Sequence, residues 1–182
     1  MGASDWASGR MLEIGGTDVR ERFAELLGEH RRIVFKVANT YAQSAEDRAD
    51  LAQEIAAQLW RAFPRYDAQR PFATWMYRVA LNVGISYLRS RGRSRAEEPL
   101  HSEPAAAARA PDETLDDARR ARALERAIAR LGRMDRALLL LHLDERSQRE
   151  IAEILGISES NVATKLSRLR QRLRGELAEE ER

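Results

Sequence analysis

The amino-acid sequence predicts an all-α fold, with two small helical domains joined by a flexible acidic linker. Apolar residues recur at intervals of three and four over most of the chain, which is the spacing of one face of an α-helix. The alternation of β-branched residues typical of strands is missing, and none of the five prolines falls inside a strong helical pattern. Between residues 94 and 117 large apolar residues almost disappear and acids accumulate, so we place the linker there.

Composition limits the class of protein. With 182 residues, of which 43% are hydrophobic, the chain can form one or two small domains with cores of their own. No apolar run approaches the ~18 residues of a membrane-spanning helix, so we expect no membrane insertion. The N-terminus has no apolar secretory segment, and the chain has no cysteine for disulfides or thiolate metal sites. These features favour a cytoplasmic protein.

The first domain is predicted to be a three-helix bundle over residues 22–93, preceded by a flexible extension at 1–21. In the second helix a leucine, isoleucine or phenylalanine recurs every fourth residue, starting at Leu51. A proline at each end of the segment that follows leaves little room for a helix there. We therefore expect helices at 23–41, 45–63 and 72–91, with a loop at 64–71.

The second domain is predicted to contain four helices over residues 118–176, followed by an acidic tail at 177–182. Apolar residues between Leu124 and Leu131 mark the first of these helices, which should end near Gly132. The run from Leu138 to Leu143 marks the second helix, and the last two belong to a motif of their own.

That motif, at residues 147–174, combines the signals of two short helices joined by a tight turn. Ser147 followed by Glu150 is a capping box, which starts a helix. Gly156 stands where a left-handed backbone can end that helix, and Ser158 can cap the next one. This helix-turn-helix layout is typical of proteins that read duplex DNA.

The second helix of the motif carries a polar and basic face. Residues 160–175 hold five basic residues and no acid. Hydroxyl, amide and guanidinium groups can bond base edges, and flanking cations can hold phosphates. The expected DNA contacts are Ser160, Asn161, Thr164, Lys165, Ser167, Arg168 and Arg172. The alternative is a solvated amphipathic helix, but such a helix needs neither the caps nor the turn glycine.

An aromatic and basic stripe follows the third helix of the first domain. One arc of about 80° on the helical wheel holds Trp75, Arg78, Asn82, Ser86 and Arg89. Rings can stack on bases, and amide and guanidinium groups can bond bases and phosphates. The alternative is a core tryptophan beside a solvated face. The neighbouring cluster of arginines favours nucleic acid, and its members are Arg89, Arg91, Arg93 and Arg95.

The second helix of the first domain is acidic instead. Residues 46–54 contain four acids and one base, which would repel DNA, so this face is expected to meet a protein. Paired carboxylates can also serve acid–base catalysis or bind a metal. However, the three histidines are scattered, and no phosphate-binding glycine loop or nucleophile motif is present. We therefore expect no catalytic residue, no metal and no cofactor.

The chain resembles the extracytoplasmic-function group of bacterial sigma factors, in the sigma-70 family. The resemblance covers about residues 22–93 and 118–176, and the family's order and spacing are kept. It is carried by DRADLAQEIAAQLWRAF, by RPFATWMYRVALNVGISYLRSRGR and by the helix-turn-helix. It implies the family's second and fourth conserved regions, with the linker in place of the third. The implied function is to direct core RNA polymerase to specific promoters and to start their melting, without enzymatic activity.

The resemblance also implies roles for individual residues. Those matching the motif that docks on the clamp helices of the polymerase's largest subunit are Asp50, Leu51, Gln53, Glu54 and Trp60. Those implied for the minus-ten element are Tyr66, Arg70, Trp75, Arg78, Asn82, Ser86 and Arg89, with the loop 66–71 capturing a flipped base. The helix 161–172 would read the minus-thirty-five element. Further implied partners are the polymerase flap region, promoter DNA and an anti-sigma factor.

Two departures from the family pattern concern the promoter sequence. Ala163 stands where a basic residue is frequent, and Asp67 stands where an arginine is frequent. A stand-alone helix-turn-helix regulator is the alternative function. It would need a dimerisation or effector domain, which residues 22–93 do not resemble.

Overall fold

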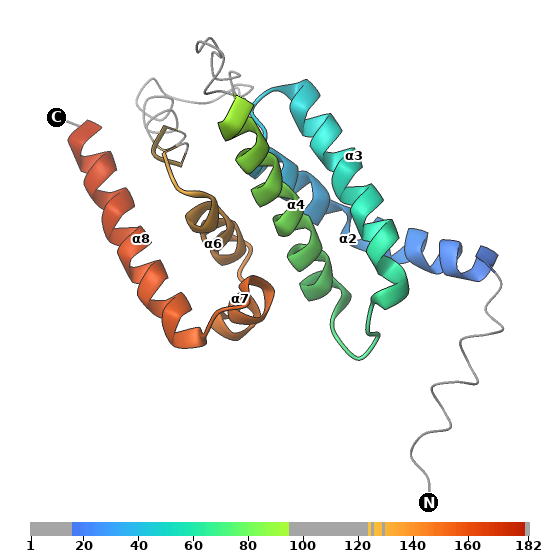
Figure 1. Cartoon of the computed structure of the whole chain (residues 1–182). Coiled ribbons are helices and arrows are strands. Elements are labelled where there is room, and N and C mark those ends of the chain that lie inside the picture. Colours follow the sequence, from blue (N-terminus) through green and yellow to red (C-terminus); the bar gives the residue numbers. More distant parts are fainter. Residues whose placement is uncertain (1–15, 95–123, 125, 129, 181–182) are drawn as a thin grey trace, which may run out of the picture.

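The computed structural model describes residues 16–94, 124, 126–128 and 130–180, and this part of the chain contains helices and no strands (Figure 1). The all-α prediction is thereby confirmed. The predicted linker at 94–117 lies almost wholly outside the described residues, as do the first 15 residues. None of the described helices combines the length and the apolar character that a bilayer crossing requires.

The first domain consists of three helices that pack against one another. They are α2 (Gly16–Tyr41), α3 (Ala45–Ala62) and α4 (Phe72–Ser94), with a short 3-10 turn at Phe63–Arg65 after α3. Ser44 starts α3 by accepting a hydrogen bond from the backbone N–H of Asp47 at 3.0 Å. The centre of the domain is formed by residues with at most 2% exposure, including Val37, Ile55, Leu59, Met76, Tyr77 and Leu81.

The second domain contains α6 (Arg133–Leu143), α7 (Gln148–Leu155) and α8 (Glu159–Glu180), preceded by helical residues at 124 and 126–128. α8 packs against both α6 and α7. The apolar stripes of the three helices meet in a core that includes Leu138, Leu141, Ile151, Ile154, Val162, Leu166 and Leu169. Burying these side chains stabilises a unit of this size by about 1.5–3 kcal/mol each before entropy costs.

Two boundaries differ from the predicted ones. α2 begins at Gly16, so the end of the extension expected to be flexible is helical, and Asp18 in the first turn favours this because an acid stabilises a helix N-terminus. α8 continues to Glu180, into the expected tail. There Arg172 and Glu176, one turn apart, form an ion pair at 2.8 Å that supports the extended helix.

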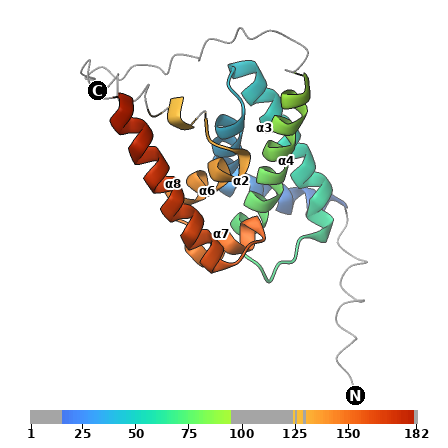
Figure 2. The ribbon, with the colours of Figure 1, turned by 60° about the vertical axis from the view of Figure 1, so that its left-hand side comes forward.

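The two domains lie against each other. α4 contacts α2 and α3 on one side and α6 and α7 on the other, and the two views of the ribbon agree on its central place (Figures 1 and 2). α2 also contacts α6. Residues far apart in the sequence are therefore brought together along α4.

A close approach between α2 and α4 predicts the effect of Gly84→Ala. A Cβ at Gly84 would lie 2.6 Å from Cδ2 of Tyr41, whose ring is 2% exposed and whose hydroxyl bonds the Arg133 carbonyl. Because the ring has no free space to move into, we expect the free energy of unfolding to fall by about 1–3 kcal/mol.

Gly28→Ala is the matched control, because its Cβ would meet no atom within 4 Å. It should stabilise the protein by about 0.5–1 kcal/mol through helix propensity. Urea unfolding followed by circular dichroism measures both changes. Equal stabilisation by the two substitutions would contradict the close packing at Gly84.

Candidate nucleic-acid and protein interfaces

The helix-turn-helix has the local geometry that the sequence predicts. Glu150 accepts a hydrogen bond from the Ser147 N–H at 2.9 Å, and the Ser147 hydroxyl oxygen accepts one from the Glu150 N–H at 3.2 Å. This reciprocal capping box starts α7. Gly156 ends α7 with φ 68° and ψ 36°, a left-handed conformation that suits glycine.

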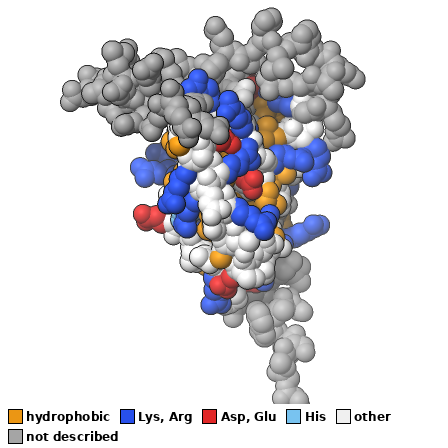
Figure 3. All heavy atoms as spheres, turned by 90° about the vertical axis from the view of Figure 1, so that its left-hand side faces the viewer, with side chains coloured by type: hydrophobic (Ala, Val, Ile, Leu, Met, Phe, Trp, Pro, Cys, Tyr) orange, Lys and Arg blue, Asp and Glu red, His pale blue; other side chains and the backbone are white. Residues whose placement is uncertain are grey.

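The start of α8 presents polar side chains to solvent. The Ser158 hydroxyl accepts a hydrogen bond from the Asn161 N–H at 3.3 Å. Val162 and Leu166 turn inward with 0% and 3% exposure, so the opposite face of the helix points outward. The predicted contacts that are exposed there are Ser160, Asn161, Thr164, Ser167 and Arg168. Figure 3 shows Lys and Arg side chains gathered over this side of the molecule, with fewer Asp and Glu among them.

Two of the predicted DNA contacts on α8, Lys165 and Arg172, differ from the other five. Lys165 is only partly exposed. The Arg172 guanidinium donates to the Arg130 carbonyl at 3.2 Å and to Glu176 at 2.8 Å. Arg172 thus bonds within its own domain in this arrangement, although its side chain remains exposed.

The predicted stripe on α4 is exposed except for its tryptophan. Its exposed members are Arg78, Asn82, Ser86 and Arg89. Met76 and Ala80 occupy the opposite face with 0% exposure. Trp75 is half-buried, and its ring lies 5.2 Å from Phe72 and 5.1 Å from Tyr66 between ring centroids. Trp75 therefore packs against core aromatic rings while part of the residue remains accessible to solvent.

An aromatic cluster joins the end of α3 to the start of α4. Phe63 is its centre, since its ring contacts four others at centroid distances of 5.1–6.3 Å. The cluster comprises Phe23, Trp60, Phe63, Tyr66, Phe72 and Trp75. Phe23 contacts Trp60 at 5.1 Å, so the rings form a continuous path from α3 to the loop. Phe63 is not among the residues predicted from the sequence, although the density of aromatic residues around Pro64 is a visible signal.

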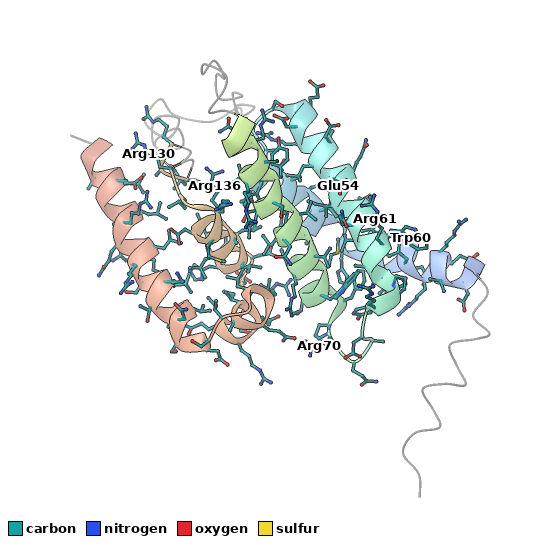
Figure 4. The ribbon with its side chains drawn as sticks, viewed as in Figure 1. Glu54, Trp60, Arg61, Arg70, Arg130 and Arg136 are labelled. Atoms are coloured by element: carbon teal, nitrogen blue, oxygen red, sulfur yellow. The ribbon has the colours of Figure 1, made fainter. Side chains whose placement is uncertain are left out.

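The loop after α3 is closed by its own hydrogen bonds. The Tyr66 hydroxyl donates to the Arg70 carbonyl at 2.6 Å, and Asp67 accepts a bond from the Gln69 N–H at 3.0 Å. Burial, followed by the negative charge of Asp67, raises the pKa of the Tyr66 phenol, so the hydroxyl stays protonated and remains a donor. The loop is therefore held in one shape, with the Arg70 side chain exposed on it (Figure 4).

The acidic face of α3 is exposed, with one correction to the predicted set. Asp50, Gln53 and Glu54 are exposed, and Trp60 is 37% exposed. Leu51 is 2% exposed, so its side chain belongs to the core and supports the face from within. Glu54 accepts a hydrogen bond from Gln58 at 2.7 Å and lies 3.7 Å from Arg61 (Figure 4).

One arginine of the predicted basic cluster, Arg91, pairs with side chains of the first domain. Arg91 forms an ion pair with Asp47 of α3 and donates to the Tyr87 hydroxyl. The hydrogen bond from Ser44, with smaller contributions from Tyr87 and Arg91, holds the pKa of Asp47 below its usual range. Arg91 and Asp47 thus fasten α4 to α3.

No group of three or more potential metal ligands occurs within the described ranges. The geometry instead defines a class: a helical two-domain protein with a helix-turn-helix, a second exposed basic face and a separate acidic face.

Comparison with known proteins identifies the family. The model described as Sigma-70 region 2 matches residues 26–94, and the model described as Sigma-70, region 4 matches residues 121–173. The two matches fall on the two helical domains, and the chain belongs to the sigma-70 family.

Relatives with similar sequences belong to the extracytoplasmic-function group. The ECF RNA polymerase sigma factor SigW of Bacillus subtilis is 24% identical over 87% of this chain and 90% of its own length. The ECF RNA polymerase sigma factor SigE of Mycolicibacterium smegmatis is 30% identical over 85% of this chain and 61% of its own length.

Two solved structures share the fold. CnrH, in complex with the cytosolic domain of CnrY, is 24% identical, with a TM-score of 0.61 over 87% of this chain and 89% of that chain. RpoE of Bartonella quintana, in complex with the anti-sigma factor NepR, is 21% identical, with a TM-score of 0.64 over 89% of this chain and 98% of that chain.

The capping box predicts how the stability of the second domain depends on pH. The hydrogen bonds from Ser147 hold the pKa of Glu150 below its ordinary range. A folded-state pKa below the unfolded value of about 4.3 stabilises the fold above that pH, and the stabilisation is lost as the pH falls. Glu150→Gln should therefore lower the free energy of unfolding at pH 7, and the difference from the wild type should shrink towards pH 3.

Ser147→Ala is the companion variant, since it removes the largest cause of the shift. It should cost about 1 kcal/mol at pH 7 and flatten the same pH dependence. Urea unfolding between pH 3 and 7 measures both. A parallel loss of stability in the wild type and in Glu150→Gln would count against this role.

Proposed function

We propose that this chain is the promoter-specificity subunit of RNA polymerase, acting in the cytoplasm and performing no covalent chemistry itself. The observation that carries the proposal is that three faces of different character occur on one chain. An acidic face lies on α3, an aromatic and basic face on α4 and its loop, and a polar and basic face on α8. A stand-alone DNA-binding regulator has no evident use for the acidic face.

The face of α3 is proposed to dock on the clamp helices of the polymerase's largest subunit. Asp50, Gln53 and Glu54 are accessible there, and Trp60 adds an exposed apolar edge. Charged groups around an exposed aromatic ring are typical of protein interfaces, where the ring supplies affinity and the charges supply orientation.

The loop and the exposed face of α4 are proposed to bind the melted minus-ten element. Trp75 offers a ring edge for stacking, Asn82 offers an amide for base edges, and Arg78 and Arg89 offer cations for phosphates. The hydrogen-bonded loop from Tyr66 to Arg70 supports capture of a flipped base, because a loop with a fixed shape lowers the entropy cost of binding.

The first half of α8 is proposed to read the minus-thirty-five element in the major groove. Ser160, Asn161, Thr164, Ser167 and Arg168 are exposed there and offer hydroxyl, amide and guanidinium groups. The same domain is proposed to contact the polymerase flap region.

An anti-sigma factor is proposed as a further partner. The solved relatives CnrH and RpoE are bound to CnrY and to the anti-sigma factor NepR. This chain exposes large apolar side chains in both domains, Phe35 at 57% and Leu143 at 69%, which such a partner could cover.

Run-off transcription with core polymerase tests the proposal. Genomic DNA fragments should yield discrete transcripts only when the chain is present. Asp50→Arg should weaken polymerase binding by about tenfold or more and reduce the transcripts accordingly. Glu29→Arg makes the same change of charge at an exposed site on α2 and should leave both unchanged. If no template gives a transcript that depends on the wild-type chain, the proposal fails.

The aromatic cluster predicts a defect in melting. Phe63→Leu removes the ring that holds Tyr66 and Trp75 in place, so the loop should lose its fixed shape. Open-complex formation, followed by permanganate reactivity of unpaired thymines, should fall by about tenfold. The affinity for polymerase should fall less, because Phe63 contacts Tyr66 and Trp75 directly but reaches Trp60 only through Phe23. Phe35→Leu, at an exposed site, is the matched control. Equal melting by the two variants would remove Phe63 from this role.

A further inference from the structure

The loop proposed to bind the minus-ten element carries an acid among its arginines. Asp67 is exposed, and its Oδ2 atom lies 3.8 Å from Nε of Arg70 on the same loop. Arg65, which directly precedes Tyr66, is exposed as well. Arginines attract the phosphates of DNA, whereas a carboxylate repels them and weakens binding. The acid is therefore not explained by affinity for the DNA backbone.

The turn of the loop accounts for an oxygen at position 67 but not for its charge. Asp67 Oδ1 accepts a hydrogen bond from the Gln69 N–H at 3.0 Å, and the Asp67 carbonyl accepts one from the Arg70 N–H at 3.0 Å. In a turn of this kind the amide oxygen of an asparagine serves as well as a carboxylate oxygen. Since a neutral side chain would close the same turn without repelling phosphates, the shape of the loop does not explain the negative charge.

The Asp67 carboxylate lies beside the aromatic cluster. The Tyr66 hydroxyl donates to the Arg70 carbonyl, and the Asp67 carbonyl accepts from the Arg70 N–H, so the ring and the turn meet at one residue. The negative charge of Asp67 adds to burial in raising the pKa of the Tyr66 phenol, as expected for near neighbours. Tyr66 lies 5.1 Å from Trp75 between ring centroids, and both residues are partly exposed. A base that stacks on these rings thus has its edge near the tip of the loop.

An ionised carboxylate selects among the bases because it only accepts hydrogen bonds. Flipped bases are read at their Watson–Crick edge. Cytosine, adenine and guanine each carry an exocyclic amine, and carboxylates in complexes with DNA accept hydrogen bonds from the amine of cytosine. Thymine has no amine, and its ring N–H lies between carbonyl oxygens that repel a carboxylate. A carboxylate beside a captured base therefore favours any base except thymine.

We propose that Asp67 is a specificity-determining residue of the minus-ten loop, whose carboxylate accepts a hydrogen bond from the exocyclic amine of the captured base. The loop takes cytosine, adenine or guanine and disfavours thymine, which leaves the carboxylate without a donor. A site built to bond a polar group discriminates strongly against a ligand that lacks that group, because the charged side chain then loses water without a replacement. The inference rests on the proposed capture of a flipped base by this loop.

Transcription from matched templates tests the specificity. The starting template is the strongest promoter in the run-off assay, and each minus-ten position is changed in turn to all the bases. With core polymerase and the full-length chain, single-round transcript yield should show a position at which thymine is the poorest base, about fivefold or more below the best one.

Asp67→Asn separates the charge from the turn. Its amide oxygen can still accept the Gln69 N–H, so the loop keeps its shape. Its amide group also donates, to the carbonyl oxygens of thymine, so the discrimination against thymine should shrink to about twofold or less. A loop that merely lost its shape would lower the yield from all templates together. Glu29→Gln makes the same acid-to-amide change at an exposed site on α2 and should keep the wild-type preference.

A base analogue tests the amine itself. Cytosine at that position is replaced by 2-pyrimidinone, which lacks the amine and keeps the ring carbonyl. The minus-ten strands are mismatched, so that base pairing plays no part. The affinity of polymerase carrying the wild-type chain should fall by about fivefold or more. With Asp67→Asn it should fall by about twofold or less, because a neutral acceptor forms the weaker hydrogen bond. Equal losses would show that the amine is not the partner of Asp67.

The outcomes separate the specificity of the loop from the promoter role. If thymine equals the best base at every minus-ten position, or if Asp67→Asn keeps the wild-type discrimination, the specificity role of Asp67 is overturned and the promoter role stands. If no template yields a transcript that depends on the chain, the promoter role fails and the specificity role fails with it. A penalty confined to thymine, relieved by Asp67→Asn and reproduced by removal of the amine, supports both.

Discussion

Helix α4 must bury one face and leave another accessible, and the rest of the structure depends on that division. Gly84 lets α4 approach α2 so closely that the Tyr41 ring lies over its backbone. A helix is rigid over this length, so the packing of the buried face determines the direction of Arg78 and Asn82 on the other side. The core of the first domain thereby orients its candidate DNA-binding face.

The aromatic cluster connects the packing of the core to the loop between α3 and α4 in the same way. Phe63 lies between Phe23 and the rings of Tyr66 and Trp75, so one packed group supports both the end of α3 and the start of α4. In the first domain, the candidate polymerase face and the candidate minus-ten face are therefore not independent modules. Trp60 of one face and Trp75 of the other belong to the same aromatic cluster, so a change in the packing of one reaches the other through contacting rings.

Sequence reasoning succeeded where the signal was local. The capping box of Ser147 and Glu150, the glycine that ends α7 and the period of apolar residues in α3 each depend on neighbours within one or two turns. For Leu51, the apolar periodicity and the family resemblance predict different environments. Its place in a repeat of every fourth residue predicts burial, whereas the family resemblance implies a docking contact. The structure agrees with the periodicity, since 2% of Leu51 is exposed.

The helices, their caps and the sides on which apolar and charged residues lie can be predicted from the chain alone, because they follow from the 3.6-residue period and from hydrogen bonds between near neighbours. The pairing of distant polar groups depends instead on the packing of the helices. Arg91 is withdrawn from the basic cluster by Asp47, Lys36 meets Asp144 from 108 residues away, and Arg70 meets Glu153 from 83 residues away. Such pairs depend on how whole helices and domains are placed, and no local pattern along the chain encodes that placement.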